Sequence, residues 1–98
     1  YFVKNDTYYK REQLYGTPQG DYPDNCERFT FFSRAVIEFC RTFSYKANVI
    51  HLNDWQTALA AVYLKTVYKN EPLFANTATL MTIHNLAYQG IFWAYDMP

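Results

Sequence analysis

Residues 48–84, NVIHLNDWQTALAAVYLKTVYKNEPLFANTATLMTIH, decide the fold. The stretch opens with a short apolar run rich in β-branched residues, about 48–52, and closes with a similar run, about 79–84. Such nearly continuous runs are typical of strands buried on both faces of a parallel sheet. Between them, residues from about 55 to 69 carry apolar side chains at helical spacing, with Asp54 as the predicted N-cap. The stretch therefore predicts a strand–helix–strand unit with parallel strands.

Another helix is predicted before this unit, over about residues 25–43. Asp24 is its expected N-cap, and Glu27 stands three residues later, where it would complete a capping box. Apolar residues then recur at helical gaps, at Phe29, Phe32, Val36, Phe39, Cys40 and Phe43. We expect this stripe to face the core, with Ser33 and the charged residues on the other side.

The first 23 residues are irregular and rich in tyrosine. Residues 1–3 could form a short strand, whereas Gly and Pro interrupt residues 4–23, which predicts a long loop. Long loops inside compact domains are usually functional. The whole order predicts an α/β fold with an open parallel sheet and flanking helices, because 98 residues are too few for the eight units of a TIM barrel.

Composition disfavours several classes of protein. Nine basic and nine acidic residues give a formal net charge of zero, so no long-range field attracts nucleic acid or an anionic membrane. No apolar run approaches the roughly 18–20 residues of a membrane span. Half of the residues are hydrophobic and a fifth are aromatic, which argues against disorder. No basic leader with an apolar stretch occurs, so no secretion signal is expected. The chain begins at Tyr1, without a Met or a polar opening tail, so we expect a piece of a longer protein.

Cys26 and Cys40 both fall on the helix predicted over residues 25–43. A rise of about 1.5 Å per residue places them ~21 Å apart. A disulfide needs Cα atoms within about 7 Å, so we expect two reduced, buried, structural thiols, which fits the cytosol. Neither CxxC nor HxxxH spacing occurs, so a zinc site built by the protein is not expected.

Polar side chains follow both strands of the predicted sheet. Asn53 and Asp54 come after the first strand, and His84 and Asn85 come at the end of the second. Parallel strands end at the same edge of a sheet, and ligands bind outside the carboxyl ends of such strands. We therefore expect these four residues to meet in one crevice, together with the start of the helix at Trp55.

Each candidate also has a structural interpretation. Asp54 would more often be a helix cap than a catalytic acid, and His51 would more often be a hydrogen-bonded core histidine. Trp55 either packs beneath the site or stacks on a sugar, with packing favoured. His84 has either a functional role or a local hydrogen bond to the backbone. Arg28 either pairs with a carboxylate or reaches the crevice to bind an anion or a hydroxyl.

Several chemistries lack their motifs. The three glycines are scattered, so there is no GxGxxG or Walker loop to hold a phosphate. No GxSxG nucleophile elbow occurs, and two histidines do not complete a hydrolytic constellation. The many aromatic residues suit carbohydrate stacking, and they equally suit packing of the core and loops.

Three strings together resemble the bacterial glycogen synthase and plant starch synthase family. They are DYPDN at residues 21–25 with Arg28-Phe29, HLNDWQT at residues 51–57 and TIHNLAYQG at residues 82–90. The resemblance implies an interior part, residues 1–98, of the N-terminal Rossmann-like domain of a two-domain glycosyltransferase of GT-B type. This family transfers glucose from ADP-glucose to the non-reducing end of an α-1,4-glucan with retention, and needs no metal or other cofactor. The setting it implies is the bacterial cytoplasm, or a plastid for a plant protein.

The resemblance also implies roles for individual residues. It gives catalytic roles to Asp24 and Asn53. Many relatives have a His in place of Asn53 that holds the donor glucose, and an amide can likewise donate to and accept from a sugar hydroxyl. The substrate-binding residues that it implies are Asn25, Arg28, Asp54, Trp55, His84, Asn85, Tyr88 and Gln89.

The family's Lys-x-Gly-Gly-Leu loop and its second domain are missing from this sequence, so we expect the segment alone to be inactive and, with exposed strand edges, to self-associate. A non-catalytic α/β module that binds sugar or protein is the alternative from another class. A sucrose-related hexosyltransferase with the same two-domain build is a third, disfavoured by the Tyr88-Gln89-Gly90 string.

Overall fold

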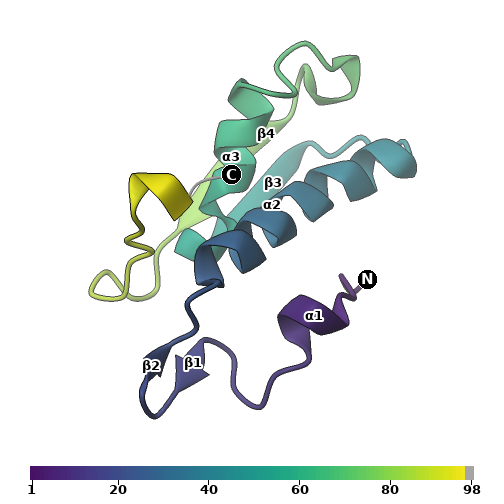
Figure 1. The fold of residues 1–98 in the computed structure, drawn as a ribbon. Coiled ribbons are helices and arrows are strands. Elements are labelled where there is room, and N and C mark those ends of the chain that lie inside the picture. Colours follow the sequence, from purple (N-terminus) through teal and green to yellow (C-terminus); the bar gives the residue numbers. More distant parts are fainter. Residues whose placement is uncertain (97–98) are drawn as a thin grey trace.

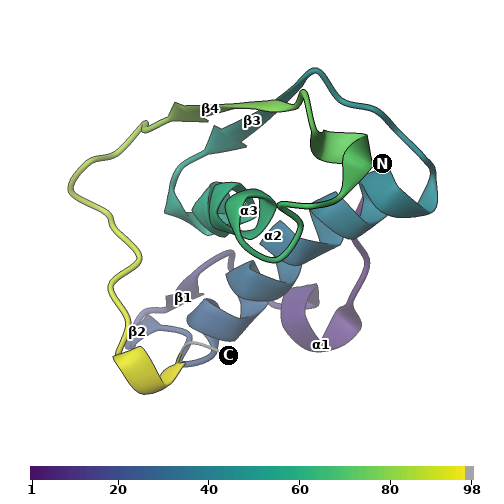
Figure 2. The ribbon, with the colours of Figure 1, turned by 90° about the horizontal axis from the view of Figure 1, so that it is seen from above.

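The computed structural model describes residues 1–96 and shows a small α/β unit with a parallel sheet (Figure 1). In chain order its elements are α1 (Asp6–Tyr9), β1 (Gly16–Thr17), β2 (Gly20–Asp21), α2 (Asn25–Thr42), β3 (Val49–Asn53), α3 (Trp55–Lys65), the 3-10 helix η1 (Pro72–Phe74), β4 (Ala78–Thr82) and the 3-10 helix η2 (Ala94–Asp96). Seen from above, α3 lies between the sheet of β3 and β4 and the helix α2 (Figure 2). The helix α1 lies on the far side of α2, and the hairpin β1–β2 lies beside the start of α2.

The predicted strand–helix–strand unit is confirmed. β3 and β4 pair in parallel, with Ile50 opposite Thr79 and Leu52 opposite Met81. Both strands lie within two residues of their expected ranges. The prediction that they are buried on both faces is wrong for the residues described. Ile50 and Leu52 point into the core while their neighbours in β3 are exposed, because helices cover only one face of this sheet (Figure 2).

β4 is still more open, with four of its five residues exposed. Leu80 is exposed opposite His51, so both belong to the uncovered face. The sequence suggested that His51 is a core histidine, and the structure shows that it is not. Its Nε2 instead lies 2.8 Å from the hydroxyl of Thr82 on β4. This hydrogen bond joins the two strands across their open face.

α2 runs within one residue of its expected range, but the face that it buries is not the predicted one. The buried residues facing inward are small or β-branched and recur at helical spacing: Cys26, Thr30, Ser33, Ile37 and Cys40. Ser33, which was expected outside, is 1% exposed and donates a hydrogen bond of 3.3 Å to the backbone carbonyl of Gln56 in α3. Short side chains let the two helices approach closely. The phenylalanines instead flank this seam, and Phe43 at the helix end is largely exposed.

Asp24 and Asp54 lie at the N-cap positions of α2 and α3, as predicted, but neither side chain makes a capping hydrogen bond. Asp24 makes no side-chain cap to α2, and its carboxylate instead forms an ion pair of 2.6 Å with Arg11. Glu27 does not complete a capping box, because its carboxylate accepts the hydroxyl hydrogen of Tyr8. Asp54 makes no cap to α3 either, and its carboxylate is bound to His84. In each case a distant partner replaces the local one.

α3 ends earlier than expected, at Lys65 rather than at residue 69. Tyr68 then turns back into the core, where it joins Ile37, Ile50, Leu52 and Phe74 in one apolar cluster. Neither Cys26 nor Cys40 forms a disulfide and both are buried, as predicted. Burial raises the pKa of both thiols. Within residues 1–96, no helix is long and apolar enough to cross a membrane.

Residues 1–3 do not form the suggested strand. The long loop of residues 4–23 is present, but it contains the single-turn helix α1 and the two-residue strands of the hairpin β1–β2. Gly20 adopts a φ of +136°, a conformation that side chains rarely take and that the tight connection of this hairpin requires. Aromatic residues of the loop pack on α2, with the rings of Tyr15 and Phe29 6.1 Å apart.

Candidate functional site

The carboxyl ends of β3 and β4 are joined by Asp54 and His84, as the strand order predicted. The backbone N–H of Asp54 donates to the carbonyl of Thr82 at 2.8 Å. The carboxylate of Asp54 accepts the backbone N–H of His84 at 2.7 Å and lies 2.8 Å from the imidazole Nδ1. The hydrogen bonds from the His84 backbone, and then from its ring, hold the pKa of Asp54 below its ordinary value.

The pairing with Asp54 determines that Nδ1 of the His84 ring carries a hydrogen. An ionised carboxylate only accepts hydrogen bonds, so Nδ1 of His84 must carry a hydrogen. In the neutral ring, Nε2 is then an acceptor, and no partner for it occurs within residues 1–96. The side chain of His84 is 60% exposed, which leaves Nε2 accessible to a ligand.

Asp54 adopts a φ of 59° and a ψ of −178°, which is unusual for a residue with a side chain. Strained backbone of this kind clusters at functional sites, where surrounding contacts maintain it. Here those contacts are the hydrogen bonds to Thr82 and His84. The turn after β3 therefore holds the carboxylate toward the end of β4.

Asn53 lies at the exposed end of β3. Its backbone is held by the hydroxyl of Thr57, which accepts the N–H of Asn53 at 2.7 Å and lies 3.0 Å from its carbonyl oxygen. The amide side chain of Asn53 has no hydrogen-bond partner among the described residues. Sequence reasoning missed Thr57. The available signal was a threonine in the first turn of a helix, where hydroxyls bind nearby backbone groups.

Trp55 forms the apolar floor of the site. Its ring packs against Phe29, Tyr88 and Phe92 at centroid distances of 5.0, 6.0 and 5.4 Å. The packing interpretation of Trp55 is therefore the one that the structure favours. Gly90 lies directly over the indole, where a Cβ atom would approach the Trp55 ring to within 2.6 Å of its Cδ2. The buried indole N–H finds no acceptor among residues 1–96.

A hollow of about 350 Å³ lies over this floor. Its lining includes five residues to which the resemblance gives roles, together with Gly90: Asp54, Trp55, Asn85, Tyr88 and Gln89. The loop of residues 85–90 is held by its own bonds, since Asn85 accepts the N–H of Ala87 at 3.1 Å and Gln89 donates to the carbonyl of Leu86 at 2.8 Å. The amides of Asn85 and Gln89 and the phenol of Tyr88 therefore form one wall of the hollow, beside the Asp54–His84 pair.

Asn25 and Arg28 do not line this hollow. Both are buried beneath the loop of residues 4–23, at 2% and 3% exposure. The Arg28 guanidinium pairs with no carboxylate within residues 1–96, so neither of its two sequence interpretations describes these contacts. Asp24 is held by Arg11 on the same side of the molecule. A direct contact of these three residues with a substrate stays a prediction.

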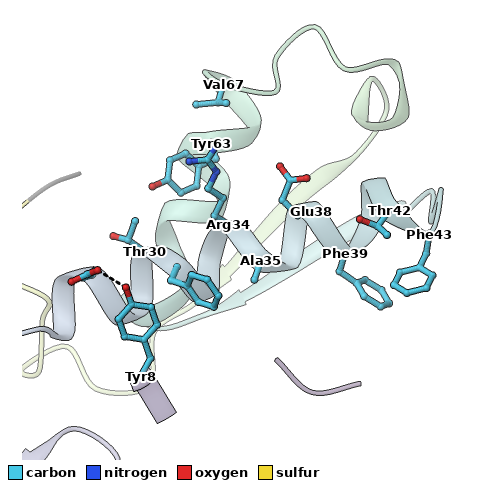
Figure 3. A pocket seen from close by; sticks show the side chains of 12 residues that line it. Tyr8, Thr30, Arg34, Ala35, Glu38, Phe39, Thr42, Phe43, Tyr63 and Val67 are labelled. Carbon is cyan, nitrogen blue, oxygen red and sulfur yellow. Dashed lines mark hydrogen bonds between the residues drawn. The ribbon is translucent and has the colours of Figure 1, made fainter. Parts of the chain in front are cut away.

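A larger hollow of about 700 Å³ lies along the outer face of α2 (Figure 3). Phe31, Phe39 and Phe43 give it an apolar lining, and Arg34 and Glu38 stand at its side. It contains none of the predicted site residues. Within the part of the chain that the structure describes, no group of three or more His, Cys, Asp or Glu side chains is placed to hold a metal ion.

Comparison with known proteins gives a consistent result. The family model described as "Starch synthase catalytic domain" matches residues 1–98. "Glycogen synthase 2" of Geobacter sulfurreducens is 52% identical over 92 residues, covering 94% of this chain and 19% of the relative. "Glycogen synthase" of Thermodesulfovibrio yellowstonii is 50% identical over 92 residues, with 94% and 18% covered. "Glycogen synthase" of Koribacter versatilis is 49% identical over 98 residues, with 100% and 20% covered, so the chain spans about a fifth of these relatives.

Proposed function

The chain belongs to the family of starch synthase catalytic domains, and from this membership we propose that it is one part of a longer glucan synthase. This longer protein, which contains residues 1–98, is called the complete synthase. It transfers glucose from ADP-glucose to the non-reducing end of an α-1,4-glucan, with retention of configuration. The proposal draws support from identities near 50% with proteins named glycogen synthase over 94% or more of the chain.

The observation that carries the proposal is the Asp54–His84 pair at the carboxyl ends of two parallel strands. Asp54 orients the ring, and Nε2 of His84 is left to bind a sugar hydroxyl. Asn53, Asn85 and Gln89 add amide groups, each of which can donate and accept, as hydroxyl recognition requires. The aromatic floor of Trp55 suits the apolar face of a sugar ring.

We assign no covalent nucleophile to this segment. In the proposed reaction the departing phosphate of the donor helps to deprotonate the acceptor hydroxyl on the same face of the sugar. The residues of this segment bind and orient the sugar and keep water from it. The roles of Asp24 and Asn53 in catalysis, and of Asn25 and Arg28 in substrate binding, belong to this proposal.

The complete synthase would have the two-domain GT-B build, with Rossmann-like domains facing each other across the cleft. Residues 1–98 would supply one wall from the N-terminal domain, and the second domain would grip ADP-glucose from the other side. This arrangement makes the segment alone inactive. The proposal includes no metal cofactor, no nucleic-acid or membrane partner and a cytoplasmic location in a bacterium, with a plastid as the plant counterpart.

A chimaera tests the proposal. Residues 1–98 replace the matching segment in one of the three relatives named above, and incorporation of labelled glucose from ADP-glucose into glycogen is measured. We expect incorporation by the chimaera, a large loss in its His84→Ala variant, and none from residues 1–98 alone. A folded chimaera that transfers no glucose contradicts the proposed function. Incorporation by the segment alone contradicts its dependence on the second domain, and binding of glycogen without transfer would favour a non-catalytic module.

A further inference from the structure

Arg28 is a buried cation with unusual partners. Its guanidinium donates to the carbonyl of Tyr8 at 2.8 Å, the side-chain oxygen of Asn25 at 2.6 Å and the carbonyl of Leu14 at 3.1 Å. All three acceptors are neutral, and no carboxylate lies within ion-pair distance among residues 1–96. The ring of Tyr22 lies 5.1 Å from the guanidinium carbon and adds a cation–π contact.

This arrangement is not the simplest way to stabilise a fold. Burying a charge is unfavourable unless it is well paired, and an apolar residue of similar size often serves stability as well. What a guanidinium offers is a rigid, planar set of donors in fixed directions. Here these donors hold Tyr8 of α1 and Leu14 in the bend before β1 at fixed places against α2.

Asn25 extends this hold to the hairpin. Its side-chain oxygen accepts from Arg28, and its Nδ2 donates to the carbonyl of Tyr15 at 2.8 Å. The same carbonyl accepts the N–H of Tyr22 at 2.9 Å, which closes the base of the hairpin β1–β2. A continuous chain of hydrogen bonds therefore runs from Arg28 through Asn25 to the hairpin.

The hairpin in turn touches the wall of the candidate site. The hydroxyl of Tyr88 donates to the carboxylate of Asp21 at 3.3 Å. The rings of Tyr15 and Tyr88 lie 5.8 Å apart. Burial and the nearby Asp21 raise the pKa of Tyr88, so its hydroxyl keeps the hydrogen that this contact uses. Tyr88 lines the hollow above Trp55.

We infer that Arg28 and Asn25 are positioning residues: they hold Tyr15 and Asp21 against Tyr88 and so fix this wall of the hollow. The resemblance to the synthase family implies that this wall borders the glucan acceptor. The inference rests on the proposed function and specifies how these two buried residues serve substrate binding: they act through the hairpin and Tyr88. The loop of residues 4–23 is then a part of the site that α2 holds in place.

The Asn25→Asp variant of the complete synthase separates positioning from stability. Aspartate still accepts from Arg28 and gives it a counter-charge, but it cannot donate to the carbonyl of Tyr15. We expect the melting temperature to be retained while amide hydrogen exchange over residues 15–22 becomes faster. The KM for glycogen should rise about three- to tenfold, as the loss of one hydrogen bond predicts, with smaller changes in kcat and in the KM for ADP-glucose.

Arg28→Lys and Arg28→Met extend the series. Lysine keeps the charge but lacks the planar fork of donors, so Arg28→Lys should moderately raise both the amide hydrogen-exchange rate over residues 15–22 and the KM for glycogen. Arg28→Met loses the charge and the donors, so both quantities should rise further. Arg34→Met is the matched control, since Arg34 is an exposed arginine of the same helix that lines the outer hollow. It should leave both measurements at the wild-type level.

Unchanged exchange over residues 15–22 in Asn25→Asp overturns the inference. A loss of melting temperature with faster exchange throughout α2 also overturns it, because that result shows a purely structural role. Failure of the wild-type complete synthase to use ADP-glucose instead contradicts the proposed function. In that case faster exchange confined to residues 15–22 still supports the hold of Arg28 and Asn25 on the hairpin.

Discussion

The carboxylate of Asp54 binds His84 twice, through the backbone N–H at 2.7 Å and through the ring Nδ1 at 2.8 Å. The two residues are thirty positions apart and lie at the ends of neighbouring parallel strands. One side chain therefore fixes both the path of the chain after β4 and the direction of the imidazole. A residue that sequence reasoning treats as a helix cap thus becomes the link between two strand ends.

Asp54→Asn should lower kcat/KM of the complete synthase by about tenfold to a hundredfold, the range expected when a hydrogen bond to a charged group is lost. The amide NH2 would face Nδ1, so the neutral ring would take the tautomer in which Nδ1 accepts and Nε2 carries the hydrogen, and Nε2 could no longer accept from a sugar hydroxyl. Incorporation of labelled glucose into glycogen measures the change. Asp6→Asn is the control, because Asp6 is an exposed acid in α1 with no side-chain partner among the described residues. Equal activity of the two variants would show that the link is dispensable.

The Asp54–His84 pair also predicts that the free energy of unfolding depends on pH in the acidic range. The pKa of Asp54 is lowered from its ordinary 3.8 by its hydrogen bonds to His84. A carboxyl whose pKa is depressed by folding contributes stability that is complete above its unfolded pKa and is lost as the pH falls through its folded pKa. The difference in free energy of unfolding between the wild type and Asp54→Asn should therefore shrink below about pH 4. Urea unfolding of the complete synthase at several pH values tests this, and a constant difference would contradict it.

Gly90→Ala should destabilise the site wall. The added Cβ would lie within 2.6 Å of Cδ2 of Trp55, so the indole or the loop must move. Such overpacking typically costs about 1–3 kcal/mol. Thermal unfolding and tryptophan fluorescence of the complete synthase measure the loss and the displacement. Ala87→Val, which adds volume at an exposed position of the same loop, should change neither, and a Gly90→Ala protein as stable as wild type would refute the close approach.

Residues 1–98 alone should self-associate. No part of residues 1–96 covers the outer face of the β3–β4 sheet, and Leu80 lies on this face with 53% of its surface exposed. Sedimentation of the isolated chain should show a mass that rises with concentration above the 11.6 kDa monomer. Leu80→Lys should reduce this association, because a charge on an open strand opposes pairing with another sheet. Gln13→Lys adds the same charge in the N-terminal loop and should have little effect, and a monomer at all concentrations contradicts the prediction.

Much of the core unit could be predicted from residues 48–84. The two β-branched runs and the helical spacing between them led to parallel strands, and parallel strands bring Asp54 and His84 to one edge. The proximity of Asp54 and His84 follows from the parallel pairing of β3 and β4 alone. It was therefore predicted correctly even though the burial of both strands was not. The N-cap positions of Asp24 and Asp54 were predicted correctly, but their carboxylates do not cap the helices, because Arg11 and His84, distant in sequence, bind them instead.

Periodicity could not tell which side of α2 faces the core. Both sides make contacts, one with α3 across Ser33 and Ile37, and the other with aromatic residues of the N-terminal segment, as in the 4.8 Å contact of the Tyr1 and Phe39 rings. The more apolar stripe lies on the second side, so hydrophobicity favoured the wrong face. The role of Arg28 was equally hidden, because two of its three acceptors are backbone carbonyls, of Tyr8 and Leu14, which carry no side-chain signature.

The seam between α2 and α3 contains a natural reporter of its own opening. Cys40 belongs to the apolar cluster of this seam, and burial raises the pKa of its thiol. Because alkylating reagents react with the exposed thiolate, they can modify this residue only during moments when the helices separate. The rate at which Cys40 is alkylated in the otherwise native protein would therefore count those openings, without any engineered label.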